Sequence, residues 1–180
     1  MFFVISGYLI TSIIYKEMLG GTFSFATFYE RRIYRLFPAL FAVMAAVSVG
    51  AIALPLPADL QATSNRLGTT VMFASNVYFW MTAGYFAAPA DLKPLLHTWS
   101  LAVEEQFYIF PPLSLLLLQR YVPRRVIGAI AFACLISFIA SVFTVTRAPN
   151  YVFYLPMFRA WELLLGVLLA LRAIPLLGQR

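Results

Sequence analysis

The sequence predicts an all-α fold, a polytopic bundle of transmembrane helices, from three observations. Of its 180 residues, 62% are hydrophobic and only 11% are charged, whereas soluble domains hold about 45–50% apolar and about 25% charged residues. The apolar residues form several runs close to the ~20 residues that cross a bilayer. The 13 basic residues gather at the ends of these runs, where they orient a membrane protein. We therefore expect the lipid bilayer, and no nucleic acid, to be the partner of this chain with its net charge of +6.

The first apolar run covers residues 2–15 and is followed by Lys16 and Glu17. It has neither the basic start nor the small-residue cleavage site of a signal peptide. It is also shorter than the ~20 residues that a full span needs. We expect a shortened first span, and we expect the chain to be a fragment of a longer membrane protein.

The next elements are predicted from helix breakers and caps. Gly20 and Gly21 end the first helix, and Ser24 can cap a short amphipathic helix that leads into a span at residues 39–57. Residues 58–66 have the composition of a polar loop. Further spans are expected within residues 95–118, 124–145 and 154–171.

Residues 68–87 are ambiguous, because apolar side chains alternate with hydroxyls, an amide and two glycines. If this segment crosses the bilayer, the twelve basic residues outside the expected span that carries Arg159 divide evenly, six on each side. If it re-enters or is buried, nine lie inside, namely Lys16, Arg31, Arg32, Arg35, Arg120, Arg124, Arg125, Arg172 and Arg180, and three lie outside, namely Arg66, Lys93 and Arg147. The positive-inside rule prefers the second arrangement. We expect one re-entrant or buried short helix here, surrounded by protein or a water-filled cavity.

The segment 95–118 holds the only histidine, His97, and the adjacent acids Glu104 and Glu105. On a helix, His97, Glu104 and Tyr108 would fall near one face. An acid near the bilayer centre costs about 2.5–3.5 kcal/mol unless it has a partner or a wet cavity. Two interpretations stay open. These residues form part of a site, or the acids cap a helix N-terminus and favour its dipole.

Two further groups of charges allow both structural and functional interpretations. Arg32 and Arg35 are three residues apart, hence on one helix face. They either orient the protein or form an anion clamp, since guanidinium groups bind phosphate in a bidentate manner. Arg159 and Glu162, also three apart, can pair with each other or face Glu104 or Glu105. No metal site is expected, and the residues alone leave a transporter and a membrane-embedded transferase equally open.

Five sequence blocks follow one another in this order: FFVISGYLIT, FYERRIYRLFPAL, SNVYFW, LLHTWSLAVEEQFYIFPPL and RAWELLLG. Together they resemble acyltransferase family 3, the bacterial membrane O-acyltransferases similar to O-antigen acetylases. The resemblance implies that residues 1–180 are part of a single membrane-embedded acyltransferase domain. They would form about half of a ten-helix bundle in the inner (plasma) membrane of a bacterium, and lack its first helix.

The resemblance also implies the reaction. Family members transfer an acyl group, usually acetyl, from acetyl-CoA or another acyl-CoA to a hydroxyl of a cell-surface or exported glycan or of a lipid-linked saccharide. The alternative is a transporter or flippase of a polysaccharide precursor. Arg32 and Arg35 match the family's Arg-x-x-Arg motif, which implies a role in binding the coenzyme's phosphates. Arg159 and Glu162 are expected to line the substrate site.

The family's main catalytic histidine lies on a helix upstream of FFVISG, which this sequence does not contain. We therefore expect His97, Glu104 and Glu105 to assist a histidine located elsewhere, and the chain alone to be inactive. A histidine oriented by a carboxylate can take the proton of the acceptor hydroxyl as it attacks the thioester. Because donor and acceptor approach from opposite sides of the bilayer, we expect the arginines and the His97–Glu104 region on opposite faces.

Overall fold

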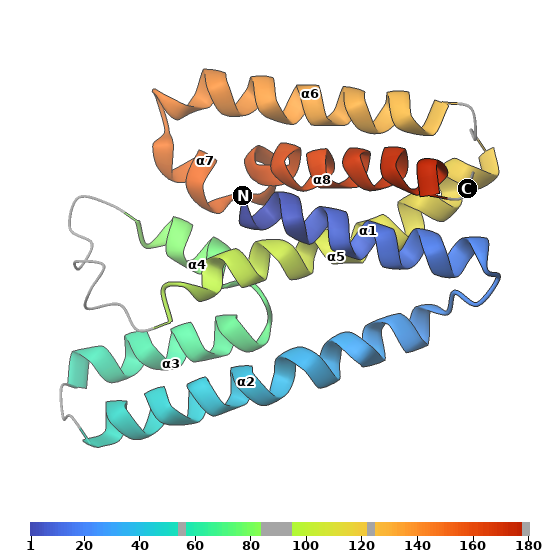
Figure 1. The fold of residues 1–180 in the computed structure, drawn as a ribbon. Coiled ribbons are helices and arrows are strands. Elements are labelled where there is room, and N and C mark those ends of the chain that lie inside the picture. Colours follow the sequence, from blue (N-terminus) through green and yellow to red (C-terminus); the bar gives the residue numbers. More distant parts are fainter. Residues whose placement is uncertain (54–56, 84–94, 122–124, 178–180) are drawn as a thin grey trace. The chain divides into compact units, whose positions relative to one another are not determined.

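The computed structural model describes residues 1–53, 57–83, 95–121 and 125–177, and it contains only helices and turns there, with no strand (Figure 1). The helices in these ranges are α1 (Phe2–Leu19), α2 (Phe25–Ala53), α3 (Pro57–Val71), α4 (Ser75–Met81), α5 (Thr98–Tyr121), α6 (Val126–Val145), α7 (Pro149–Tyr154) and α8 (Pro156–Leu177). The predicted all-α fold is confirmed. Lys93, Arg124 and Arg180, which entered the charge count, lie outside the described residues.

The chain divides into two compact units. Unit 1 comprises Met1–Phe23 and Val103–Arg180, and so contains α1, most of α5, and α6 to α8. Unit 2 comprises Ser24–Ala102 and contains α2, α3, α4 and the first turn of α5.

Three helices of the described part are long and apolar enough to cross a membrane, namely α1, α2 and α6. The first of them is longer than the sequence predicted, since α1 continues through Lys16 and Glu17 to Leu19 and reaches 18 residues. The second is also longer. The predicted short amphipathic helix and the following span form the single 29-residue helix α2, which extends about 43 Å against a hydrocarbon thickness of ~30 Å.

Residues 58–66 were predicted to be a polar loop, and this prediction is wrong, because they lie within the 15-residue helix α3. The chain then turns at residues 72–74 and continues as the seven-residue α4, whose Ser75, Asn76 and Phe79 are buried. Residues 68–83 are therefore not one continuous helix. The expected short buried helix is present as α4, while residues 84–87 lie outside the described part.

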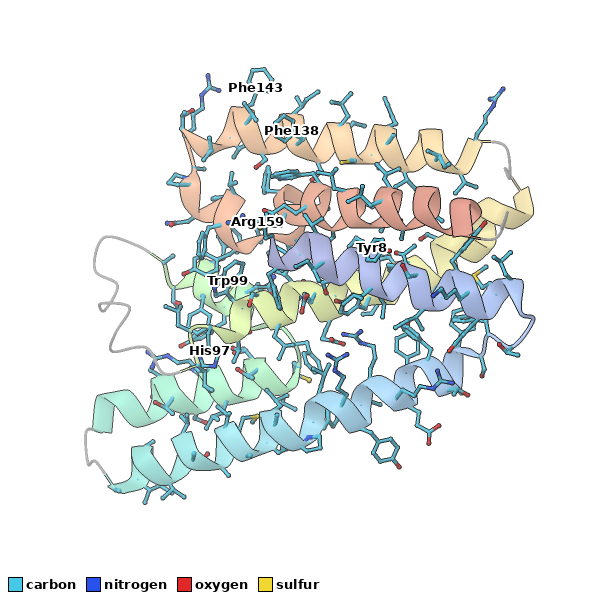
Figure 2. All side chains as sticks on the ribbon, viewed as in Figure 1. Tyr8, His97, Trp99, Phe138, Phe143 and Arg159 are labelled. Carbon is cyan, nitrogen blue, oxygen red and sulfur yellow. The ribbon has the colours of Figure 1, made fainter. Side chains whose placement is uncertain are left out.

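In unit 1, α8 lies between α1 and α6 and packs against both (Figure 1). Phe138 of α6 points toward α8 and contacts the Trp161 ring at a centroid distance of 5.2 Å, whereas Phe143 points away from α8 and is 74% exposed (Figure 2). The outward face of α6 is apolar along its length, as expected of a lipid-facing surface. Its exposed members include Phe132, Leu135, Ile136, Ile139 and Val142.

A hydroxyl from α6 is built into the first turns of α8. Ser137 Oγ donates a hydrogen bond to the Met157 carbonyl at 2.6 Å and accepts one from the Trp161 N–H at 3.0 Å. These two backbone groups are four residues apart, so they would pair with each other in a regular α-helix. Cys134 Sγ also donates to the Trp161 carbonyl, at 3.5 Å. The start of α8, which carries Arg159, is thus fixed by α6.

Candidate active site

A buried acid in unit 1 is held by a tyrosine one turn further along α5. Glu104 is 5% exposed and Tyr108 is 3% exposed. The Tyr108 hydroxyl donates a hydrogen bond to Glu104 Oε1 at 3.3 Å, and it also contacts Ser6 Oγ of α1. Because a carboxylate can only accept, Tyr108 uses its one proton on Glu104, and the Ser6 hydroxyl is the donor to Tyr108. The acid is therefore part of a hydrogen-bonded chain between two helices.

The alternative interpretation of the acids, as a cap of the helix N-terminus, is wrong. The first turn of α5 contains no acidic residue, since Glu104 and the half-buried Glu105 lie one turn further on. The helix dipole acts mainly within the first turn, so it does not account for these side chains. The prediction that His97 shares their helix face is also wrong, because His97 precedes α5 and is exposed.

Arg159 and Glu162 pair with each other, as one of the two predicted alternatives proposed. Arg159 Nη1 donates to Glu162 Oε1 at 2.8 Å, and the two side chains are 25% and 12% exposed. The guanidinium also lies over the Phe153 ring at 5.4 Å from the centroid. Pairing lowers the cost of these two charges among the apolar residues that surround them in α8.

The turn that carries His97 belongs to unit 2 and is fixed by backbone and hydroxyl contacts. Thr98 Oγ1 donates to the Leu95 carbonyl at 2.7 Å, and Ser100 Oγ donates to the His97 carbonyl at 3.1 Å. Leu95 is 2% exposed and Thr98 is 4% exposed. The His97 side chain between them is exposed (Figure 2). The backbone of this turn is thus anchored while the imidazole stays accessible.

Three hydroxyl side chains, which we call the polar clamp, join this turn to α3 and α4. They are Thr70, Ser75 and Thr98, all at most 4% exposed. Ser75 Oγ donates to the Thr98 carbonyl at 3.0 Å, and Thr70 Oγ1 lies 3.4 Å from Thr98 Oγ1. Since the Thr98 hydroxyl already donates to a carbonyl, Thr70 is the donor in that contact. The clamp brings together the SNVYFW and HTWSL blocks of the sequence.

The arginine pair lies in the first half of α2, within unit 2. Arg32 is half-buried and Arg35 is exposed. Two residues beyond Arg35, the Phe37 ring contacts the Phe73 ring of the α3–α4 turn at a centroid distance of 6.2 Å. The sequence predicted that the arginines and the His97–Glu104 region lie on opposite faces, and this stays a prediction.

The sequence analysis did not single out Ser6, Thr70 or Ser75 as site residues, and it noted Tyr108 only by its spacing. Their partners lie far away in the sequence, so no local pattern indicates the contacts. The described residues contain no group of three His, Cys, Asp or Glu side chains placed to hold a metal ion.

The chain matches the family described as an acyltransferase domain over residues 1–173. An uncharacterised protein of Haemophilus influenzae is 40% identical over 179 residues, which cover 95% of this chain and 73% of that protein. The O-acetyltransferase OatA of Staphylococcus aureus is 33% identical over 173 residues, which cover 94% of this chain but only 28% of OatA. No solved structure matches the chain. Because the family match extends over nearly all of its residues, the chain belongs to acyltransferase family 3.

Proposed function

We propose that this protein is a membrane O-acetyltransferase. It transfers acetyl from an acyl-CoA, in the first instance acetyl-CoA, to a hydroxyl of a cell-surface or exported glycan at the inner membrane. The family match over residues 1–173 carries the proposal, and the name of the Staphylococcus aureus relative, an O-acetyltransferase, supports acetyl as the group. Residues alone left a transporter equally open, and membership of an acyltransferase family favours the transferase.

In this proposal some of the described side chains bind the donor, and others orient the reacting groups. Arg32 and Arg35 bind the phosphates of the donor, because guanidinium groups on one helix face suit a polyanion. Glu104, held by Tyr108, supplies a fixed carboxylate that can orient a protonated group. Units 1 and 2 are then parts of a single acyltransferase domain, with Arg159–Glu162 and Glu105 near the substrate and His97 assisting.

The experiment uses membranes from cells that produce the natural full-length protein. Acetyl-CoA labelled in its acetyl group is added, and label is measured in the polysaccharide fraction and as an alkali-labile ester. We expect label that depends on the protein and that falls when unlabelled acetyl-CoA competes. Movement of a saccharide precursor across the membrane without incorporation of acetyl would instead support the transporter.

A further inference from the structure

The end of α7 and the first two turns of α8 bring two rings and an ion pair together in unit 1. We call Phe153, Tyr154, Arg159 and Glu162 the α7–α8 corner. The rings of Phe153 and Tyr154 stand nearly edge to face, with 4.9 Å between their centroids, and the Arg159 guanidinium lies 5.4 Å from the Phe153 centroid (Figure 2). Phe153 is 42% exposed and Tyr154 is half-buried. The corner therefore offers aromatic surface beside a paired hydrogen-bond donor and acceptor.

The corner is held in one arrangement by α6. The Ser137 hydroxyl of α6 takes the place of a backbone hydrogen bond between Met157 and Trp161, because it bonds to both of these backbone groups. Arg159 lies within this turn of α8, and its guanidinium is 2.8 Å from Glu162 Oε1. A site that is ordered before its ligand arrives loses less conformational entropy on binding.

The corner lies at the end of unit 1 that carries the buried acid Glu104. The helices α1, α5 and α8 run in the same direction in Figure 1. Ser6 of α1 contacts Tyr108 of α5, and the next residue of α1 lies directly against the backbone of α8 at Leu163. Glu104 precedes Tyr108 by four residues, and the ion pair of the corner precedes Leu163 by one to four residues. Both therefore lie on the same side of this contact between three helices.

Stability alone does not account for the ion pair. A charge pair that is largely out of water often contributes no more than apolar side chains of the same volume, and ionisable residues within membrane helices usually mark a functional site. Aromatic residues are common where membrane helices meet water, but that role needs no arginine held over a phenyl ring. The arrangement is instead suited to a ligand that has both an apolar face and hydroxyl groups.

We propose that the α7–α8 corner binds a sugar ring of the acceptor glycan. This inference rests on the proposed function, and it assigns the corner to the acceptor and not to acyl-CoA. The C–H face of a sugar ring packs on an aromatic ring, and its hydroxyls both donate and accept hydrogen bonds, as the carboxylate and the guanidinium require. Because the charges of Arg159 and Glu162 offset each other, the pair suits hydroxyls better than the phosphates of the donor, which bind best to guanidinium groups that keep their charge. No bond is made or broken at the corner.

Binding of polysaccharide tests the inference without an activity measurement. The natural full-length protein is reconstituted into liposomes. The probe is the polysaccharide of the cells that naturally produce the protein, treated with alkali to remove its esters and then labelled with tritium. The liposomes are floated on a density gradient, and the label that floats with them is compared with that on protein-free liposomes. We expect saturable binding that depends on the protein.

Two variants and two controls locate this binding. Phe153→Leu keeps an apolar side chain but removes the ring, and we expect the Kd for the polysaccharide to rise about two- to twelvefold, the equivalent of one aromatic contact. Arg159→Lys keeps the charge beside Glu162 but loses the planar fork, and we expect a rise of the same size, the equivalent of one hydrogen bond. Phe153→Tyr keeps the ring and should bind as wild type does. Phe143→Leu removes a 74% exposed ring from the outward face of α6 and should also bind as wild type does.

The acetyl-transfer assay then distinguishes the acceptor from the donor. In Phe153→Leu we expect the KM for the alkali-treated polysaccharide to rise by the same factor as the Kd, while the KM for acetyl-CoA keeps its wild-type value. A ring that only supported the fold would not change one KM alone. Thermal unfolding identifies a variant that fails to fold, and Arg159→Lys then takes the place of Phe153→Leu.

The outcomes separate the inference from the function on which it rests. If the wild-type protein transfers no acetyl group to the polysaccharide, the proposed function fails and the inference fails with it. If acetyl is transferred but the folded Phe153→Leu and Arg159→Lys variants bind polysaccharide as wild type does, the corner is not the acceptor site and the proposed function stands. A raised KM for acetyl-CoA in place of the polysaccharide would assign the corner to the donor and overturn the inference. Equal label on protein-free liposomes would also overturn it, because the lipid would then be what binds the probe.

Discussion

Gly7 of α1 and Gly166 of α8 lie against each other with no side chain between the two helices. A Cβ on Gly166 would stand 2.6 Å from the Tyr8 nitrogen and 3.0 Å from the Gly7 carbonyl carbon, and a Cβ on Gly7 would overlap the Leu163 carbonyl oxygen. The neighbours are backbone atoms, so they cannot turn away as a side chain can. Small residues at such crossings let helices approach closely inside a membrane.

We expect Gly166→Ala to lower the free energy of unfolding of the protein by about 1–3 kcal/mol, the usual cost of overpacking. Gly128→Ala is the matched control, because a Cβ there would meet nothing within 4 Å and alanine favours a helix over glycine by about 1 kcal/mol. The measurement is thermal unfolding in detergent. Equal unfolding temperatures for the two variants would contradict the close crossing.

Much of the helical architecture could be predicted from the sequence, because a run of about 20 apolar residues indicates a membrane-spanning helix. The helix α3 could not be predicted in this way. Its buried positions include Thr63 and Thr70, 5% and 2% exposed, which lie two turns apart on one face. A helix that buries hydroxyls in place of apolar side chains gives no apolar periodicity, so residues 58–66 have the composition of a loop.

Removal of the Tyr108 hydroxyl should destabilise the protein. Tyr108→Phe takes one hydrogen-bond donor from the buried Glu104 and one contact from Ser6, and a weakened buried carboxylate interaction costs about 1–3 kcal/mol. Tyr34→Phe is the control, because Tyr34 is 73% exposed. We expect Tyr108→Phe to lower the unfolding temperature and Tyr34→Phe to leave it unchanged. A Tyr108→Phe protein as stable as wild type would show that Ser6, Tyr108 and Glu104 do not act as a chain.

The charged members of the candidate site could be identified from the sequence, whereas the neutral ones could not. His97, Glu104 and Arg159 stand out because charges and imidazoles are rare in apolar helices. Serine and threonine are common in membrane helices as packing residues, so Ser6 gave no signal. Its contact with Tyr108 joins residues 102 positions apart, and only the packing of α1 beside α5 brings them together.

A double-mutant cycle should reveal coupling between Arg159 and Glu162. Their ion pair is 2.8 Å long and its side chains are 25% and 12% exposed, so each charge alone would remain in apolar surroundings. We expect the destabilisations of Arg159→Met and Glu162→Met to add up to more than that of the double variant. The difference, which is the coupling energy, should exceed the ~1 kcal/mol that bounds exposed pairs. Additive changes in unfolding free energy would show that the pair contributes nothing to stability.

The arginines of α2 provide a direct test of donor binding. Arg32→Lys and Arg35→Lys keep the positive charge that orients the helix, so membrane insertion should be normal. Lysine lacks the planar fork that binds phosphate in a bidentate manner, and charge-assisted hydrogen bonds contribute about 1.5–3 kcal/mol. We therefore expect the KM for acetyl-CoA to rise about ten- to a hundredfold where KM tracks affinity, while the KM for the acceptor changes little.

Arg147→Lys is the matched control for these two variants, because Arg147 is also an exposed arginine but lies in the turn between α6 and α7, outside α2. We expect its lysine variant to use acetyl-CoA as wild type does. If all three variants insert normally and keep the wild-type KM for acetyl-CoA, the arginines only orient the protein. If all three raise it equally, the phosphates respond to total guanidinium charge and not to a clamp on one helix face.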